Sequence, residues 1–546
     1  MNTKPKTLIL TDTSSKARAL KRILGRHYTV ESTEGFLRDL PKTQIGIDPD
    51  NNFALKVITV RGKAPLLKQL RRDTVDALRI YLASEPGCDG EALAFHYCQL
   101  FGINPESKCR VELRAFTKDD IKRSIADARA IDHGLVEKYW TRRSVSRLIS
   151  YSLNPYLWCT LYRGLSINMM QLMLLRLLDQ YKPSATQAVQ LSDAPVSLKT
   201  LQLWAAHELK FSAGRAVLIA RQLYEGINLD KNFSGLVTYF RDEPIEPTTE
   251  DLTPEALKEF LTPNQFKIYS AIDARHLTFP TKDEQSLERP TDFELMLELE
   301  RLKVNWVDTY SAAINTLVKN HYVERTESRY SLTDLGREVL SSIDKFFSGV
   351  LDTKFFLELE TMLEDVAQGR KTRLEVLRTV YEPFGKVLSE AMKSLGDDPK
   401  PKEPPIIESE QLCDKCGRRM IIKRGRYGLF LACPGYPECK NTMPYVEYLD
   451  ERCPKCSGRL TAKNLNKRRV FYGCENWPEC DFGTWDVPQD KHCSTCGAVM
   501  LLHRFKERPS MLYCSNEQCP TRQNHPINKI LDRIHRQKKS ARSDEQ

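Results

Sequence analysis

The sequence predicts a multidomain α+β protein: an α/β domain at the N-terminus, a largely helical middle region and three small zinc ribbons near the C-terminus. Three observations support this class. Strand-like and helix-like segments alternate near the N-terminus, helical patterns dominate from Asp119 onward, and twelve of the 16 cysteines recur in three sets of four. A chain of 546 residues is long enough for about three or four domains.

The N-terminal domain is expected over residues 1–130. Thr7–Thr11 has the apolar character of a buried strand, and Ser15–Leu24 has the pattern of a helix. Ile80–Ala83 predicts a second strand, which runs into a turn at Pro86–Gly90. Strands that alternate with helices are typical of a mostly parallel sheet.

Helical periodicity dominates the central region, 131–394. The segments that predict helices are Val136–Tyr151, Met169–Tyr181, Leu198–Leu209, Arg215–Glu225 and Phe293–Leu302. Asp308–Leu340 has the order helix, turn, helix with a hairpin at Tyr322–Leu332, which predicts a winged-helix-like unit. A plain helical hairpin is the simpler alternative for this segment.

The C-terminal quarter begins after a stretch rich in proline and charge, Leu395–Glu410, a composition typical of a linker. Three ribbons are expected over 411–445, 451–487 and 491–525, followed by a basic tail over 526–546.

The twelve clustered cysteines predict three structural zinc sites. Each set has a CxxC pair, which turns two thiolates toward one point, and a second pair that completes a tetrahedron around zinc. We expect no secretory signal in this chain, and zinc is then favoured over disulfides. The predicted ligands are Cys413, Cys416, Cys433 and Cys439; Cys453, Cys456, Cys474 and Cys480; Cys493, Cys496, Cys514 and Cys519.

The formal net charge of +10 lies entirely in the C-terminal quarter. From Gln411 to Gln546 there are 25 Lys and Arg against 15 Asp and Glu, so the rest of the chain is balanced. Excess cation in one region is typical of a protein that binds a polyanion, although a solubilising tail would have the same composition. Three filled zinc centres lower the net charge to about +4, so attraction to nucleic acid must come from individually placed cations.

Each ribbon carries a basic turn with aromatic residues, which predicts binding of single-stranded DNA. Cations follow the phosphates, and exposed rings stack on unpaired bases. The alternative is that the rings pack onto the small core of their own ribbon. The candidate DNA-binding residues are Lys423, Arg424, Arg426, Tyr427, Lys467, Arg468, Arg469, Tyr472, Arg504, Phe505 and Lys506.

An acidic turn follows the second predicted strand. Glu85 and Asp89 lie four residues apart there, and Asp12 ends the neighbouring strand. Carboxylates at the ends of adjacent strands can share a hard divalent cation, so Asp12, Glu85 and Asp89 are candidate Mg²⁺ ligands. A solvated acidic turn is the simpler alternative.

Several motifs occur in the order found in the type IA DNA topoisomerases, which this chain resembles. They are LILTDTSSKARALKRIL, EGFLRDLP, ASEPGCDGEALAFH, GLVTYFR, TDFELMLELERLKVNWVDTYSAAINTLVKNHYVE and the four-cysteine ribbons. The resemblance implies an N-terminal Toprim domain that holds Mg²⁺. It also implies a tyrosine that cleaves one DNA strand as a 5′-phosphotyrosine, with resealing that needs no ATP. The sequence has no GxxxxGK[ST] loop, in agreement with that expectation.

The resemblance also assigns site residues. Tyr239 falls on the nucleophilic tyrosine, Arg241 on an arginine that stabilises the transition state, and Lys16 on the lysine that assists the leaving oxygen; Asp12 stands where the family has a glutamate. A phenol is a weak nucleophile and needs such help. A buried strand tyrosine is the alternative for Tyr239. The same comparison makes Arg38, Thr309 and Tyr310 candidate DNA contacts.

This chain departs from the family pattern at several positions. Gly87 replaces the middle carboxylate of the acidic motif, Met169 replaces an arginine, and Phe36 replaces a DNA-contacting histidine. The segments on either side of Tyr239 that build the family's DNA gate are short. We therefore expect either a weakened enzyme that alters DNA topology or a catalytically impaired DNA-binding protein without a complete gate; a nuclease-like or strand-transfer protein is a weaker third option. A partner protein that supplies the missing gate function is left open.

The sequence also bounds the location of the protein. No apolar run approaches the roughly 18 residues of a membrane span. The N-terminal segment passes directly into the first predicted strand, so no secretory signal is expected. We expect a cytoplasmic, nucleoid-associated protein.

Overall fold

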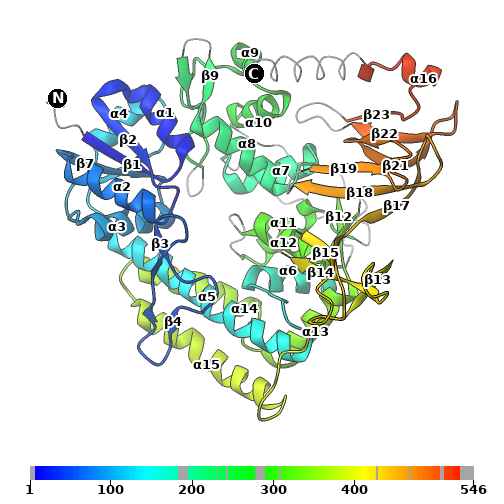
Figure 1. Ribbon diagram of the computed structural model, residues 1–546. Helices are drawn as coiled ribbons and strands as arrows, with labels where there is room; N and C mark the ends of the chain where they lie inside the picture. The colour runs from blue at the N-terminus through cyan, green and yellow to red at the C-terminus, as the bar shows by residue number, and fades with distance from the viewer. Residues whose placement is uncertain are drawn as a thin grey trace. The chain divides into compact units, whose positions relative to one another are not determined.

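The computed structural model describes residues 7–182, 195–229, 232–240, 244–275, 277, 289–304, 307, 309–326, 328–425, 428–466, 469–503 and 510–528. The chain forms two compact units, Met1–Pro404 and Pro405–Gln546. Figure 1 shows the elements of each unit.

The first unit begins with a four-stranded parallel sheet in the order β2–β1–β7–β8. Its strands are β1 (Thr7–Thr11), β2 (Tyr28–Ser32), β7 (Arg79–Ser84) and β8 (Arg110–Glu112). The accompanying helices are α1 (Ser14–Leu24), α2 (Ala64–Val75), α3 (Cys88–Phe101) and α4 (Lys118–Ala126). Strand β1 is apolar and buried at Leu8, Ile9 and Leu10, as a central parallel strand with helices on both faces requires. The predicted α/β domain is confirmed.

The β2–α2 connection holds two short antiparallel ladders. Strand β3 (Arg38–Asp39) pairs with β6 (Ile58–Thr59), and β4 (Ile47–Asp48) pairs with β5 (Ala54–Leu55). The 3₁₀ helix η1 (Gly25–His27) lies earlier, between α1 and β2.

The middle of the first unit is helical, as expected. Its long helix α5 (His133–Thr160) packs against α3, α14 (Thr353–Ala367) and α15 (Arg373–Lys393), as can be followed in Figure 1. The remaining elements before residue 290 are α6 (Met169–Gln180), α7 (Leu198–Glu208), α8 (Ala213–Glu225), β9 (Ile227–Leu229), β10 (Asn232–Ser234), α9 (Pro254–Leu257) and α10 (Pro263–Asp273).

The winged-helix-like segment has the order helix, helix, hairpin, helix. It comprises α11 (Asp292–Arg301), α12 (Tyr310–Lys319), β11 (Val323–Thr326), β12 (Arg329–Leu332) and α13 (Asp334–Phe347). The hairpin lies where it was expected. One prediction is corrected: Asp308–Leu340 holds a single helix before the hairpin, and the other helix of the pair is the earlier α11.

The predicted linker is shorter than expected. The Lys402 backbone N–H donates to the Trp158 carbonyl (2.8 Å) and its Nζ donates to the Thr160 carbonyl (2.7 Å), so the middle of Leu395–Glu410 packs on the end of α5. The end of this stretch already belongs to the first ribbon, because β13 starts at Ile407.

Each ribbon is a small antiparallel sheet. The first contains β13 (Ile407–Leu412), β14 (Arg419–Gly425), β15 (Gly428–Ala432) and β16 (Thr442–Pro444). The second contains β17 (Glu447–Arg452), β18 (Arg459–Asn466), β19 (Arg469–Cys474) and β20 (Gly483–Thr484). The third contains β21 (Val487–His492), β22 (Val499–His503) and β23 (Met511–Cys514), followed by α16 (Pro520–Gln523). All three ribbons begin four residues earlier than the sequence suggested, which keeps the 40-residue repeat.

Candidate functional site

Two carboxylates and a lysine meet at the carboxyl edge of the parallel sheet. Asp12 follows β1 and Glu85 follows β7, and these strands are neighbours. Lys16, in the first turn of α1, is only 2% exposed. Its Nζ lies 2.8 Å from Asp12 Oδ2 and 2.7 Å from Glu85 Oε1. One buried ammonium therefore joins the two carboxylates.

Tyr239 comes to the same cluster from a distant part of the chain. Its hydroxyl donates to Glu85 Oε2 at 3.4 Å, and its backbone N–H donates to the Arg114 carbonyl at 2.7 Å. The ring contacts Tyr224 edge-on, with the centroids 5.6 Å apart. Tyr239 is 2% exposed, so in this structure its hydroxyl is covered.

Tyr239 belongs to a buried hydrophobic core, in which its ring neighbours include Tyr224 and Phe240. Burial raises the pKa of the adjacent Tyr224 well above its ordinary value, and the negative charge of Glu85 adds to this effect. The structure thus brings Asp12, Lys16, Glu85 and Tyr239 together. Arg241, which was also predicted for this site, lies outside the described residues.

The three carboxylates predicted for Mg²⁺ do not form a metal site in this structure. Asp12 and Glu85 both bind Lys16, and Asp89 Oδ1 lies 3.1 Å from Arg142 Nη2. Within the described part of the chain, the only groups of three or more acidic, histidine or cysteine ligands close enough to hold an ion are the cysteine quartets. In this structure the three predicted ligands are thus engaged with Lys16 and Arg142 and are not gathered around one point.

The acidic motif also differs from the predicted turn. Helix α3 begins at Cys88, so Asp89 lies in its first turn and not in a loop. Gly87 caps this helix with φ 88° and ψ 177°, a conformation that essentially only glycine adopts. Glycine is compatible with this backbone conformation, which a residue with a side chain adopts only with strain.

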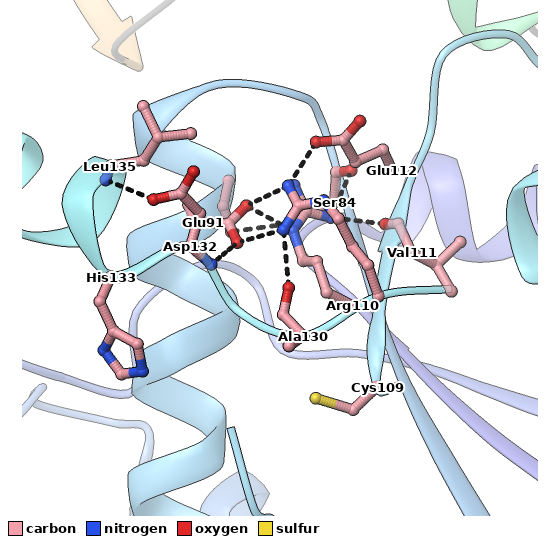
Figure 2. Close-up of polar contacts among 12 residues, drawn as sticks. Ser84, Glu91, Cys109, Arg110, Val111, Glu112, Ala130, Asp132, His133 and Leu135 are labelled. Atoms are coloured by element: carbon pink, nitrogen blue, oxygen red, sulfur yellow. Dashed lines mark hydrogen bonds and ion pairs between the residues drawn. The ribbon is translucent and has the colours of Figure 1, made fainter. Parts of the chain in front are cut away.

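A buried ion network, not predicted from the sequence, supports the loop that carries Glu85 (Figure 2). Arg110 Nε lies 2.9 Å from Glu91 Oε2, and both side chains are completely buried. Arg110 also donates to the backbone carbonyls of Ser84 (3.1 Å) and Glu85 (2.7 Å). Arg129 completes the network with contacts to Glu91 (2.8 Å) and to Glu112 (2.6 Å).

The network keeps Glu91 ionised. Burial by itself would raise the pKa of Glu91, but the hydrogen bonds from Arg129 and the charge of Arg110 lower it below the ordinary value. No sequence signal points to the pairing, because Arg110 and Arg129 lie on different elements far from Glu91 in the chain.

The three candidate DNA contacts of the first unit differ in exposure. Arg38 is exposed, and Thr309 is exposed at the N-cap of α12. Tyr310 is completely buried, and its hydroxyl donates to Asp292 Oδ1 at 2.8 Å. In this structure Tyr310 has no surface with which to contact DNA; it stabilises the winged-helix-like segment instead.

Each ribbon holds four cysteine sulfurs within 4.8 Å of one another. In the first ribbon, Cys413 and Cys439 are 3.7 Å apart and Cys416 and Cys433 are 3.3 Å apart. Tetrahedral zinc with Zn–S bonds near 2.3 Å separates its sulfurs by about 3.8 Å, so these clusters fit zinc. Asn441 Nδ2 donates to Cys413 Sγ at 3.4 Å, the kind of outer contact that orients a ligand.

The basic turns of the ribbons are only partly described. Lys423 is exposed on β14, Arg424 and Arg469 lie in strands, and Tyr472 is half-buried. The other candidates lie outside the described residues: Arg426, Tyr427, Lys467, Arg468, Arg504, Phe505 and Lys506. The exposed aromatic rings of the described part are Tyr436, Tyr448, Trp477 and Trp485; Trp485 carried no signal in the sequence.

No helix among the described residues is long and apolar enough to cross a membrane.

Comparisons with known proteins place the chain near the topoisomerases. Residues 410–448 and 450–489 match a family described as the topoisomerase DNA-binding C4 zinc finger, and residues 271–378 match the DNA topoisomerase family. The fold is similar to that of full-length topoisomerase I from Thermotoga maritima, with a TM-score of 0.62 at 23% identity. That similarity covers 80% of this chain and 97% of the Thermotoga chain.

The predicted resemblance to the topoisomerases is thus confirmed by two family matches and by the fold. The matched segments include Thr309 and the first two zinc sites. They do not include Tyr239, Lys16 or Glu85, nor the third ribbon, whose last two cysteines are one residue closer together than in the other two.

Proposed function

We propose that this protein is a type IA topoisomerase-like enzyme that binds single-stranded DNA and cleaves one strand through Tyr239. The observation that carries the proposal is the contact of the Tyr239 hydroxyl with Glu85, which itself contacts buried Lys16. Tyr239 is 154 positions from Glu85 in the chain, and the fold brings its hydroxyl to the carboxylate that also contacts the buried ammonium of Lys16.

The residues of this cluster can take the proton from the attacking oxygen and give one to the leaving oxygen during strand cleavage. The Tyr239 oxygen attacks a backbone phosphorus, and its proton passes to Glu85. A bond forms between phosphorus and the phenolic oxygen while the bond to the 3′ oxygen breaks. Lys16 gives that leaving oxygen a proton and recovers one from Glu85 across their 2.7 Å contact.

The phosphotyrosine conserves the energy of the broken bond, so the reverse reaction reseals the strand without ATP. Because Tyr239 is covered in this structure, the strand reaches its hydroxyl only after neighbouring side chains move. A step through Mg²⁺ is not part of this proposal, since Lys16 takes the place between Asp12 and Glu85.

The ribbons are proposed to hold the single strand. Exposed Lys423 is placed to contact phosphates, and Tyr436 and Trp477 present rings to unpaired bases. The other expectations of DNA contact, at Arg38 and Thr309, belong to the same proposal.

A catalytically impaired DNA-binding protein without a complete gate is not favoured. The fold comparison extends over 97% of the Thermotoga chain, so it gives no support to the loss of a large part of that fold.

The test uses the full-length, zinc-loaded protein and a single strand labelled at its 3′ end. A 5′-phosphotyrosine links the protein to the labelled fragment, so the label should migrate with the protein on a denaturing gel. Tyr239→Phe should abolish this species while strand affinity changes less than about fivefold, because one hydroxyl contributes about 1 kcal/mol at most. An undiminished adduct in Tyr239→Phe would reject Tyr239 as the nucleophile. If the unmodified protein formed no adduct, DNA binding would be the only function left to the protein.

A further inference from the structure

A groove of about 620 Å³ runs along one face of α2, beside β6, in the first unit. Its lining residues recur at helical spacing, so the groove follows the helix axis. They include Leu67, Lys68, Arg71, Arg72 and Val75, with Thr59 from β6. None of these residues belongs to the cleavage site or to the zinc centres.

Three of the four exposed large apolar side chains that the structure describes in the first unit line this groove or lie within three residues of its lining in the chain. Buried Leu67 forms its floor, Val75 is 83% exposed on its wall, and Leu78 just beyond the helix is 73% exposed. Ile58, next to Thr59, is 44% exposed. Among the described residues of the first unit, Leu218 is the one other large apolar side chain with comparable exposure. A local concentration of exposed apolar side chains is typical of a binding surface.

The same region is strongly basic. Residues 56–72 contain six lysines and arginines and no acidic residue. Lys68, Arg71 and Arg72 are exposed along the groove, and no ion pair joins them to other residues that the structure describes. Against these three cations the lining offers one carboxylate, Asp76. The groove therefore combines an apolar floor with a cationic rim.

We propose that this groove binds an acidic peptide segment of a partner protein, one that alternates carboxylates with apolar side chains. The carboxylates would pair with Lys68, Arg71 and Arg72, while the apolar side chains cover Leu67 and Val75. Helix α2, with 12 residues, is about 18 Å long, which matches about five residues of extended peptide.

Two other occupants fit less well. Duplex DNA would satisfy the cations, but phosphates gain nothing from Val75 and Leu78. The C-terminal tail of this chain, 526–546, is itself rich in Lys and Arg and would be repelled. The proposal does not depend on the cleavage reaction.

The experiment measures fluorescence anisotropy of a labelled ten-residue peptide of alternating aspartate and leucine, with full-length protein at low salt. We expect micromolar affinity, weakened at least tenfold in the double variant Arg71→Glu/Arg72→Glu and about threefold in Val75→Ser. The matched control is Lys386→Glu/Lys393→Glu, which reverses two exposed cations on α15 and should leave binding unchanged. A peptide of alternating aspartate and serine should bind at least fivefold more weakly.

Three results would overturn the proposal. The first is no binding of the leucine-containing peptide below about 1 mM. The second is equal affinity for the two peptides, or equal weakening by the α15 control, since either would reduce the effect to general charge attraction. The third is that Arg71→Glu/Arg72→Glu leaves peptide binding intact and instead weakens binding of a 20-base-pair duplex, which would make the groove a DNA site.

Discussion

At the scale of single residues, the main feature is the position of Lys16. A lysine at the start of a helix is ordinarily solvated, but here its ammonium lies between Asp12 and Glu85 and is almost fully buried. A buried ammonium without a partner is strongly unfavourable, so the two carboxylates and Lys16 stabilise one another. The arrangement places a positive charge where the related enzymes are expected to hold a divalent cation.

Replacing Lys16 tests whether its ammonium takes the place of a divalent cation. We expect Lys16→Ala to bind Mg²⁺ at least tenfold more tightly than the unmodified protein, because it leaves Asp12 and Glu85 adjacent and uncompensated. The measurement is isothermal calorimetry with MgCl₂, with Lys21→Ala as the control on the exposed face of the same helix. Unchanged magnesium affinity in Lys16→Ala would show that the lysine does not exclude the metal.

His96 gives a second prediction at this scale. Its Nε2 accepts hydrogen bonds from the backbone N–H groups of Leu37 and Arg38 (3.3 Å each), so it holds the backbone at the start of β3. Burial, with help from the charge of Arg38, lowers the pKa of His96 to about 4. The neutral ring is therefore the form that the fold prefers.

The sign of the pH effect follows from this lowered pKa. The unfolded chain takes up the proton near pH 6.5 and the folded protein only near pH 4, so this contribution to stability is complete above pH 6.5 and is lost as the pH falls toward 4. Between pH 7.5 and 5 the loss should be about 2 kcal/mol. Urea unfolding of the protein and of His96→Gln at both pH values measures the contribution of His96 to the free energy of unfolding. The variant should lose less stability over this range. Identical losses in the two proteins would contradict the lowered pKa of His96.

At the scale of elements, the junction of β7 and α3 depends on β8. Arg110 on β8 holds the carbonyls of Ser84 and Glu85, and Glu91 on α3 holds Arg110 in turn. The strand end that presents Glu85 is thus fixed by its neighbouring strand as well as by its own helix. Arg110 is a positioning residue for the proposed reaction.

Breaking the buried pair should therefore affect folding and cleavage together. Arg110→Met leaves the Glu91 carboxylate buried with one partner fewer and should lower the free energy of unfolding by about 3–5 kcal/mol. Arg123→Met, which removes an exposed ion pair on α4, should change it by less than about 1 kcal/mol. In Glu91→Leu/Arg110→Met we expect much of the stability to return, whereas cleavage stays low because the Glu85 carbonyl has lost its donor. Full recovery of cleavage in the double variant would contradict the positioning role.

The sequence predicted the elements far better than it predicted their contacts. The periodicity of β1, α6 and α7 located them to within a residue or so, and cysteine spacing alone located the zinc ligands. It could not show that Lys16 lies between the carboxylates, that Asp89 pairs with Arg142, or that Tyr310 is buried. These are contacts between distant segments, whereas a spacing pattern reports only on neighbours along the chain. The conformation of Gly87 likewise depends on how β7 meets α3.

At the scale of the whole molecule, the proposed cleavage residues and most of the excess positive charge lie in different units. The first unit holds the candidate cleavage cluster, and the second unit holds the three zinc ribbons and the excess of cations. The ribbons have small cores built largely from their own cysteines, so zinc supplies much of their folding free energy.

Removing the ribbons should weaken binding without removing the cleavage residues. A protein ending at Pro404 should bind single-stranded DNA about tenfold or more weakly, with a shallower dependence on salt, because fewer phosphates are neutralised. Zinc chelation of the full chain should have the same effect. Filter binding over a range of salt concentrations provides the measurement, and an unchanged salt slope would place the DNA contacts in the first unit instead.

The most direct test of the central claim is to locate the covalent bond. The full-length, zinc-loaded protein is incubated with a single strand in a buffer that contains no Mg²⁺ or other added divalent cation, the adduct is digested with nuclease and protease, and its peptides are analysed by mass spectrometry. We predict a nucleotide attached through phosphate to the Tyr239 side chain, formed without added divalent cation because Lys16 occupies the place between Asp12 and Glu85. A nucleotide on any other residue, or an adduct at Tyr239 that forms only with Mg²⁺ present, would contradict this account.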